Sequence, residues 1–285
     1  MSLISKKVLI IENSKEIDKA IKKIKNQNVE IYREPILPFD WKEKLINEKA
    51  IIEHPLFKRY NIEISDNNDI LKAFYSLYLS KVDSILIGHI YTSKIVFIYS
   101  IIFFGVNNSL SSSFICKNSK KNTTVWTDCA LNIKPNYSTF VNIIKNACFF
   151  YNQMISNKHT INVCLLSFST YEDSNDDTIK IYNQLKNDIE LSKIGKTNIN
   201  LIGPIQYDAA INKNVYIKKT NDKNYKKPDI FVFPDLNSGN ISYKIEAQYS
   251  KFYGPFVCGT NKKIADLSRS ATFDEIYETI KYLCN

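Results

Sequence analysis

The stretch DLSRSATFDE, residues 266–275, sets the start of the last helix of the chain. Thr272 is followed three residues later by Glu275 and then by the apolar positions Ile276 and Ile280. A hydroxyl residue three positions before a glutamate, just ahead of apolar residues at helical spacing, is typical of a capping box. We therefore predict that a helix begins at about Thr272.

Arg269 precedes this helix, and it is one of only three arginines among the 38 basic residues of the chain. A guanidinium is planar and always charged, so it can hold a carboxylate or phosphate at two points. Ser268 places a hydroxyl beside it, and the first turn of a helix offers unpaired N–H groups. Together these features favour a site for an anion or a developing oxyanion. A structural alternative remains, because serine and arginine beside a helix start also cap and pair.

Composition limits the class of protein. The chain has 285 residues, of which 44% are hydrophobic and 24% are charged, and this balance is typical of a soluble globular protein. The length suits one large or two medium domains, and we favour two. The net charge of +9 comes from scattered lysines rather than from one basic stripe. Binding to nucleic acid is therefore not expected.

The cysteines and histidines show no metal-ligand spacing. None of the six cysteines forms a CxxC pair, and the three histidines, His54, His89 and His159, are isolated. We expect buried free thiols in a reducing compartment and no metal site. The first residues lack the long apolar region of a signal peptide, so we expect a cytoplasmic protein.

Strand-like runs alternate with helical patterns along the chain, which predicts an α/β fold with largely parallel sheets flanked by helices. The expected strands are 7–11, 29–32, 113–116, 124–129, 161–168, 198–202 and 230–233, and the expected helices are 14–24, 67–82, 137–154 and 241–249, with an exposed excursion at 212–227. Residues 85–106 are almost apolar enough for a membrane span, but a polar interruption at 88–94 favours a buried strand, a loop and a buried helix.

Polar turns follow several of the apolar strand candidates. They include Thr92 and Ser93, residues 167–170, residues 235–240 and residues 266–269. In open parallel sheets, ligands bind beyond the carboxyl ends of the strands. These turns are therefore expected to converge on one cleft.

From about Val125 to the end, the sequence is similar to the phosphate acetyltransferase (phosphotransacetylase) family. The resemblance is carried by six ordered motifs: TDCALN at 127–132, LSFST at 166–170, QYDAA at 206–210, FPDLNSGNISYKI at 233–245, GP at 254–255 and DLSR at 266–269. It implies two α/β domains with the active-site cleft between them. The first would hold 1–107 with 257–285, and the second 108–256. It also implies a homodimer.

The resemblance further implies acyl transfer between coenzyme A and phosphate, with coenzyme A or acetyl-CoA as substrate and no metal. Carried across residue by residue, Ser268 would stabilise the oxyanion, Arg269 would bind phosphate and Glu275 would take the thiol proton. The substrate-binding residues expected from the motifs and polar turns are Thr92, Ser93, Lys94, Asp235, Asn237 and Asp266.

Three positions depart from the family pattern. The base position holds Glu275 where the family usually has aspartate, and two positions that hold arginine in the family fall on Ile98 and near Tyr78. Lys94 is the nearest cation that can compensate. The resemblance predicts a phosphate acetyltransferase-type enzyme, and the charge distribution and hydropathy predict no nucleic-acid or membrane partner. The alternative is a weak or silent relative that keeps the fold and coenzyme A binding as an interaction or regulatory protein.

Overall fold

A computed structural model describes residues 5–24, 28–105, 110–119, 122–171, 176–188 and 191–285. Its internal contacts divide the chain into two compact units. Unit 1 comprises Met1–Asn108 and Tyr253–Asn285, and unit 2 comprises Ser109–Phe252. The boundary expected between residues 107 and 108 lies outside the described residues.

The sheet of unit 1 is mostly parallel. Its strands follow the order β2 (Val29–Tyr32), β1 (Lys6–Leu9), β3 (Ser84–Ile87), β11 (Lys263–Asp266) and β10 (Lys251–Cys258). The first four strands run parallel, and β10 pairs with β11 in the antiparallel sense. Four carboxyl ends therefore meet along one edge of this sheet.

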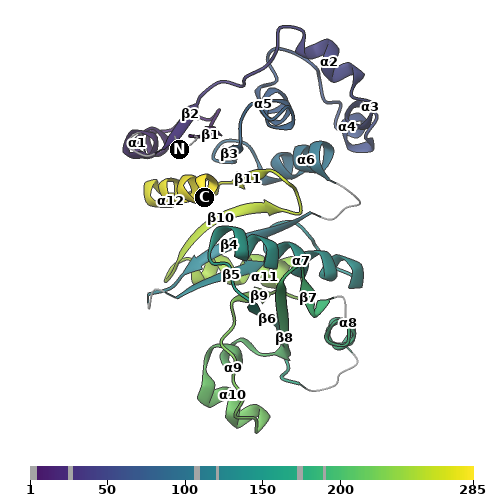
Figure 1. The fold of residues 1–285 in the computed structure, drawn as a ribbon, viewed down its shortest axis with the longest axis vertical. Helices are drawn as coiled ribbons and strands as arrows, with labels where there is room; N and C mark the ends of the chain where they lie inside the picture. Colours follow the sequence, from purple (N-terminus) through teal and green to yellow (C-terminus); the bar gives the residue numbers. More distant parts are fainter. Residues whose placement is uncertain (1–4, 25–27, 106–109, 120–121, 172–175, 189–190) are drawn as a thin grey trace. The chain divides into compact units, whose positions relative to one another are not determined.

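Two helices from opposite ends of the chain pack together in unit 1. They are α1 (Lys15–Ile24) and α12 (Phe273–Cys284), which lie side by side in Figure 1. In α1 the buried Ile17, Ala20 and Ile24 recur at helical spacing, so one face of the helix is apolar. The other helices of the unit are α2 (Trp41–Asn47), α3 (Lys49–Ile52), α4 (Pro55–Arg59), α5 (Asp69–Tyr78) and α6 (Ser93–Phe104).

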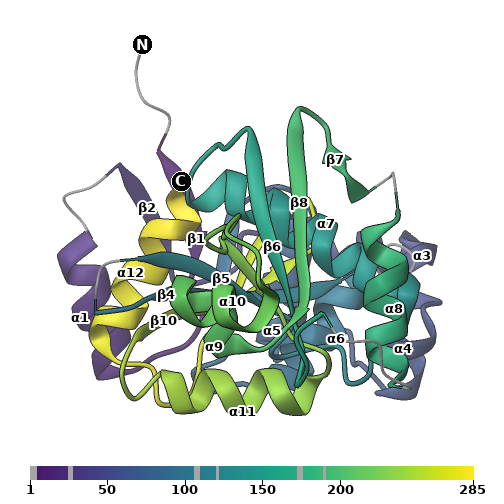
Figure 2. The same cartoon turned by 90° about the horizontal axis from the view of Figure 1, so that it is seen from below.

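The strands of unit 2 are of mixed direction. They follow the order β4 (Ser111–Lys117), β5 (Thr123–Thr127), β9 (Ile230–Val232), β6 (Thr160–Leu166), β8 (Thr197–Ile205) and β7 (Lys193–Ile194). The four central strands from β5 to β8 are parallel, and β6 and β8 lie side by side in Figure 2. The helices are α7 (Tyr137–Met154), α8 (Asp177–Lys186), α9 (Tyr207–Ile211), α10 (Lys213–Thr220) and α11 (Leu236–Glu246).

Aromatic rings fill the core of unit 2. Trp126 is 3% exposed, and its ring centroid lies 5.2 Å from those of Phe233 and Phe252 and 5.8 Å from that of Phe231. Tilted and edge-on ring pairs at such distances add to the stabilisation from buried area. This core fixes the positions of β5 and β9.

The predicted α/β class is confirmed. Residues 85–106 form the end of β3, a polar segment and α6 in their described part, as predicted, and no described helix is long and apolar enough to cross a membrane. All six cysteines are free, and five are buried. None of these six thiols, all of which lie in the described residues, forms a disulfide.

One local prediction is incomplete and another is wrong. The excursion at 212–227 contains α10, because the Asn212 side chain accepts hydrogen bonds from the backbone N–H groups of Asn214 and Val215 and caps the helix. The helix expected from Ile241 begins at Leu236, because the carboxylate of Asp235 accepts the N–H of Ser238 at 2.8 Å. Capping residues that the periodicity did not register start both helices.

Candidate functional site

Two of the predicted polar turns lie next to each other in unit 1. Strands β3 and β11 are parallel neighbours in which Ile87 pairs with Asp266. The segments that follow them, 88–94 and 266–269, therefore leave the same edge of the sheet. The backbone N–H of Leu267 donates to the carbonyl of Ile87 at 2.6 Å, which ties the two segments together.

The segment after β3 turns into the N-terminus of α6. Thr92 is the N-cap, and its hydroxyl accepts the N–H of Ile95 at 3.4 Å. Ser93 and Lys94 occupy the first turn and are exposed. A helix N-terminus of this length presents unpaired N–H groups and the positive end of the helix dipole. This arrangement attracts negative charge.

Lys94 shares an aromatic ring with a second cation. Its Nζ lies 5.3 Å from the centre of the Tyr60 ring, and Cζ of Arg59 lies 6.0 Å from the same ring centre. Both are at cation–π distance. Within the part of the chain that the structure describes, neither cation makes an ion pair. Sequence reasoning selected Lys94 but missed Arg59, because no sequence motif indicates the contact of Arg59 with Tyr60.

The turn after β11 presents Ser268 and Arg269, and both side chains are exposed. The hydroxyls of Ser268 and Ser270 lie 2.9 Å apart, and the N–H of Ala271 donates to the carbonyl of Ser268 at 3.0 Å. Arg269 has no hydrogen-bond or acidic partner among the described residues. Its guanidinium is thus available to an anion.

The predicted capping box is confirmed. The Thr272 hydroxyl accepts the N–H of Glu275 at 3.4 Å, and Oε2 of Glu275 accepts the N–H of Thr272 at 2.7 Å and its hydroxyl at 3.0 Å. The Glu275 carboxylate therefore holds the start of α12. Of the two roles that the sequence suggested for this side chain, the structure shows the structural one.

Asp266 is the most enclosed of the predicted site residues. Its side chain is 0% exposed, and neither carboxyl oxygen has a hydrogen-bond partner among the described residues. Burial, together with the Coulomb repulsion of Glu12, raises the pKa of Asp266 to about 7, and the Ser93 hydroxyl opposes this shift. A carboxyl of this kind changes its protonation near neutral pH.

Asp235 and Asn237 lie in unit 2, at the N-terminus of α11. Asp235 caps this helix, and Asn237 is in its first turn. The adjoining 128–133 segment is fixed by Asp128, whose buried carboxylate accepts N–H groups of Ala130, Leu131 and Asn132 at 3.1–3.2 Å. Burial raises the pKa of Asp128, and these hydrogen bonds oppose the shift.

Unit 2 also contains a cavity of about 350 Å³, at the edge of the strands opposite to their carboxyl ends. It lies at the amino ends of β5 and β9, where Trp126, Tyr207 and Phe231 form its apolar wall and Asn122 and Lys227 belong to its polar rim. None of the predicted site residues lines it. Because ligands in parallel sheets bind at the carboxyl ends of strands, we do not place the reaction there.

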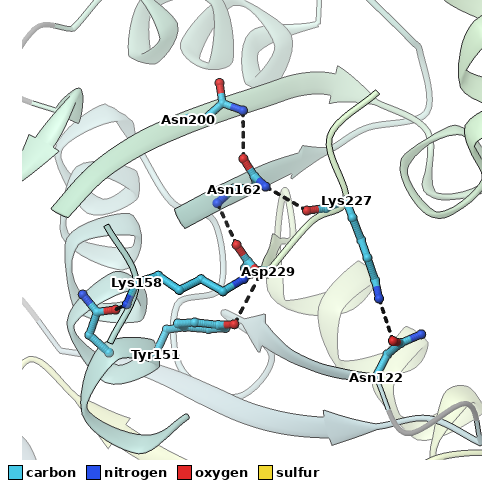
Figure 3. Close-up of polar contacts among 8 residues, drawn as sticks. Asn122, Tyr151, Lys158, Asn162, Asn200, Lys227 and Asp229 are labelled. Atoms are coloured by element: carbon cyan, nitrogen blue, oxygen red, sulfur yellow. Dashed lines mark hydrogen bonds and ion pairs between the residues drawn. The ribbon is translucent and has the colours of Figure 1, made fainter. Parts of the chain in front are cut away.

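A network of polar groups stiffens this amino edge (Figure 3). Lys227 Nζ donates to Oδ1 of Asn122 at 2.6 Å, and the Asn162 amide donates to the Lys227 carbonyl at 3.0 Å. Asp229 completes the network, with the Lys158 ammonium at 2.6 Å. The polar groups of this network are therefore hydrogen-bonded to one another.

Two residues at the carboxyl edge of unit 1 escaped sequence analysis. Glu12 follows β1, and its carboxylate accepts the N–H groups of His89, Ile90 and Tyr91, each at 2.8 Å. Arg33 follows β2 and donates to the Glu12 carbonyl at 2.7 Å. The rule that selected Thr92 and Ser93, polar residues just beyond a strand, would have found both.

The residues do not suggest a metal centre. Among the described residues, no group of three or more histidine, cysteine, aspartate and glutamate side chains is placed to hold an ion. The chemistry available at the carboxyl edge of unit 1 is that of hydroxyls, cations, helix N–H groups and one carboxyl that titrates near neutrality.

Known proteins resemble the chain in both sequence and fold. A phosphate acetyltransferase of Mycoplasma capricolum is 38% identical over 181 residues, which cover 60% of this chain and 53% of the relative. One from Buchnera aphidicola is 31% identical over 284 residues, covering 96% of this chain and 37% of the relative. The chain thus spans about half or less of the length of these two relatives.

A solved phosphotransacetylase from Staphylococcus aureus has the same fold. It superposes with a TM-score of 0.73 over 98% of this chain and 93% of its own, at 19% identity. The sequence profile of the phosphate acetyl/butaryl transferase family matches residues 4–284, nearly the whole chain. The chain therefore belongs to the phosphate acetyl/butaryl transferase family.

Proposed function

We propose that the chain transfers an acetyl group between coenzyme A and phosphate, interconverting acetyl-CoA and phosphate with acetyl phosphate and CoA. Family membership across residues 4–284 supports this reaction class. The observation that carries the proposal is Arg269, an exposed guanidinium without an acidic partner in the described residues, beside the exposed hydroxyl of Ser268. A thioester and phosphate are the reactants that such a pair can serve.

In the direction of acetyl-CoA synthesis, Glu275 takes the thiol proton of CoA and the thiolate attacks the carbonyl carbon of acetyl phosphate. A C–S bond forms, the C–O bond to phosphate breaks, and phosphate leaves with the electron pair. The Ser268 hydroxyl donates to the oxyanion, and Arg269 holds the phosphate oxygens. In the reverse direction phosphate attacks the thioester and Glu275 returns the proton to sulfur.

The family's other two arginine positions are filled by groups that cannot bind phosphate as a cation does. Ile98 is buried within α6, and the hydroxyl of Tyr78 donates to Glu48 at 3.1 Å. We propose that Lys94 and Arg59, which flank Tyr60, supply positive charge in their place. Each charge-assisted hydrogen bond to phosphate contributes about 1.5–3 kcal/mol.

We also propose that the two units are the two domains of the enzyme, and that Asp235 and Asn237 at the start of α11 bind coenzyme A. The capped N-terminus of α11 offers N–H groups to an anion. Coenzyme A carries several phosphates, and this helix start is suited to one of them.

A thiol-release assay with acetyl-CoA and phosphate tests the reaction. The substitution Arg269→Ala should lower kcat/KM roughly 100-fold or more, because two charge-assisted bonds are lost. Arg269→Lys should recover part of the loss, since it keeps the charge but not the planar fork. Lys213→Ala, which removes an exposed cation from α10 of unit 2, is the matched control and should leave turnover unchanged.

The second candidate function is that of a silent relative that binds CoA without turnover. Two points favour it: Glu275 is engaged in its capping box, and the two positions that the resemblance assigns to arginine fall on Ile98 and near Tyr78. Calorimetric titration of CoA separates the two functions. Binding without turnover in the wild type would reject the enzyme and support the silent relative.

We further propose a homodimer in which α11 contacts a second copy of the chain. The side chains of Ile241, Ile245 and Tyr249 recur every four residues and are 59%, 60% and 78% exposed. A row of apolar side chains exposed to this extent is typical of an interface. Ile245→Asp should shift the protein to monomer in sedimentation experiments, while Lys244→Ala on the same helix should not. A dimer that persists in Ile245→Asp would reject this face.

A further inference from the structure

The carboxyl edge of unit 1 gathers buried polar groups whose hydrogen-bonding capacity is incompletely used. Arg33, Glu12, His89 and Asp266 follow or end the parallel strands β2, β1, β3 and β11. Among the described residues, Nη1 of Arg33, Nδ1 of His89 and both carboxyl oxygens of Asp266 are buried without a partner. Such groups are rare in folded proteins and require an explanation.

Glu12 holds one side of the loop that follows β3. Its carboxylate accepts three successive N–H groups, from His89 to Tyr91, at 2.8 Å each. These bonds satisfy the buried charge, because a carboxylate with several N–H donors is strongly stabilised. The Arg33 guanidinium holds the backbone of Glu12 in turn, at 2.7 Å from its carbonyl. One end of the loop is thus rigid.

Asp266 touches the other side of the same loop. A Cβ atom added to Gly88 would lie 2.0 Å from Oδ1 of Asp266 and 2.7 Å from the N–H nitrogen of Leu267. Gly88 also has a φ of +107°, a backbone conformation that favours glycine. The carboxyl of Asp266 therefore packs directly on the loop backbone, and only glycine allows this approach.

The charged and titratable groups around Asp266 come from several segments. Glu12 acts from the segment after β1, His89 is next to Gly88, and Ser93 acts from the first turn of α6. Arg33 is bound to the backbone of Glu12. Of these, Glu12 raises the pKa of Asp266 and Ser93 lowers it, while burial is the largest cause of the rise to about 7. No cation offsets a charge on Asp266 among the partners recorded for it.

We propose that Asp266 is a positioning residue that presents Ser268 and Arg269 by locking the 266–271 turn against the Gly88–Tyr91 loop. The inference rests on the acyl transfer proposed above. The neutral carboxyl packs on Gly88 without charge, so the turn is held. An ionised carboxyl in the same place is buried and faces the charge of Glu12 with only the Ser93 hydroxyl to stabilise it, and the turn moves toward water. Ser268 and Arg269, the exposed residues of this turn, then lose their fixed position.

The ratio of kcat/KM between Asp266→Asn and wild type tests the proposal across pH 5.5–8.5. Asparagine has nearly the same shape but never ionises, so the variant should match wild type within about threefold at low pH. Above pH 7 the wild type should lose its fixed turn and the variant should not. The ratio should rise about tenfold over this range, mostly in kcat. A ratio that is constant with pH would overturn the proposal.

Gly88→Ala and Gly195→Ala provide a matched pair of variants. Alanine at 88 should collide with Oδ1 of Asp266 and lower kcat more than tenfold at every pH, whereas Gly195 has open space around its Cβ position and a φ of +59°. Both positions have a positive φ, but +107° at Gly88 is less accessible to alanine than +59° at Gly195, so the loss at 88 combines backbone strain with the collision. Equal losses in both variants would contradict a specific lock.

A second readout separates failure of this inference from failure of the proposed reaction. Amide hydrogen exchange at residues 88–91 and 267–271 should speed up as pH rises through about 7 in wild type, after correction for intrinsic exchange, and should not in Asp266→Asn. If turnover is absent but this difference is seen, the lock stands and the reaction is wrong. If exchange in the two proteins is the same, the lock is wrong whatever the activity.

Discussion

Asp229 and Asp266 are both buried carboxylates beside a strand, but they lie at opposite strand ends and in different surroundings. Asp229 precedes β9 in unit 2 and is 7% exposed, whereas Asp266 ends β11 in unit 1 and is 0% exposed. The carboxylate of Asp229 binds the Lys158 ammonium at 2.6 Å, the N–H of Asn162 at 3.0 Å and the Tyr151 hydroxyl at 3.3 Å (Figure 3). Asp266 has no such partner among the described residues.

The difference indicates that one edge contributes to stability and the other to the proposed chemistry. A buried carboxylate that is paired and hydrogen-bonded holds neighbouring strands together, and its charge is accounted for within the fold. One without partners weakens the fold when charged, and it is found mainly where function needs a titrating group. The amino edge of unit 2 is therefore structural, while the carboxyl edge of unit 1 carries the residues proposed for catalysis.

The largest effect is expected from the pH dependence of stability at Asp266. Its pKa in the folded protein is raised to about 7 from an ordinary value of 3.8. The neutral carboxyl therefore contributes stability that is complete below about pH 4 and is lost as pH rises through about 7. The slope is at most about 1.4 kcal/mol per pH unit, which amounts to a few kcal/mol over the window.

Denaturant unfolding of wild type and Asp266→Asn at several pH values measures this effect. Subtracting the two free energies of unfolding removes the contributions of all other titrating groups. The stability of wild type relative to the variant should fall between pH 4 and pH 7. A difference that stays level, or that rises with pH, would place Asp266 in the same class as Asp229 and remove the contrast between the edges.

The next largest effect is expected at Asp229. Asp229→Ala should lower the free energy of unfolding by about 3 kcal/mol, since it leaves the N–H of Asn162 and the Tyr151 hydroxyl without their acceptor and Lys158 without its counter-charge. The control is Asp208→Ala, which breaks an ion pair with Lys219 in which the aspartate side chain is 59% exposed. Exposed pairs contribute about 0–1 kcal/mol. Similar losses in both variants would show that the network in Figure 3 adds nothing beyond a surface pair.

The sequence predicted features that depend on local chemistry. The capping box at Thr272 follows from two residues three positions apart, and the helix at 137–154 was predicted with its observed bounds because its periodicity is uninterrupted. The α/β class follows from the alternation of such local patterns. Family membership rests on ordered motifs, so it needs no knowledge of contacts.

Most features that depend on contacts between distant residues were not predicted, although the turns after β3 and β11 were expected to converge and do lie side by side. Glu12 and the loop at 89–91 are separated by more than 75 positions, and no local pattern connects them. The contact of Gly88 with Asp266 likewise joins two strands that are far apart in sequence. Asp266 was selected as a substrate-binding residue because it belongs to a motif, and its burial in the structure was not anticipated. Pairing of β3 with β11 decides this, and sequence alone does not give strand order.

The smallest effect concerns Glu275, a third carboxylate, which is half-buried and is hydrogen-bonded to Thr272 at the start of its own helix. Its two roles, base and cap, can be separated because glutamine also completes a capping box. Glu275→Gln should leave the free energy of unfolding nearly unchanged but should lower kcat, since an amide cannot take the thiol proton. Glu275→Ala should lower kcat as well and should also cost about 1 kcal/mol of stability.

Thermal unfolding and the thiol-release assay, applied to both variants, check these outcomes. Full turnover in Glu275→Gln would mean that the carboxylate only caps α12, and the base would then have to be sought elsewhere at the carboxyl edge. Loss of turnover at full stability would show that a carboxylate with a structural partner can also serve chemistry. Carboxyl groups with and without hydrogen-bond partners would then differ in what sets their protonation state, but both kinds could take part in catalysis.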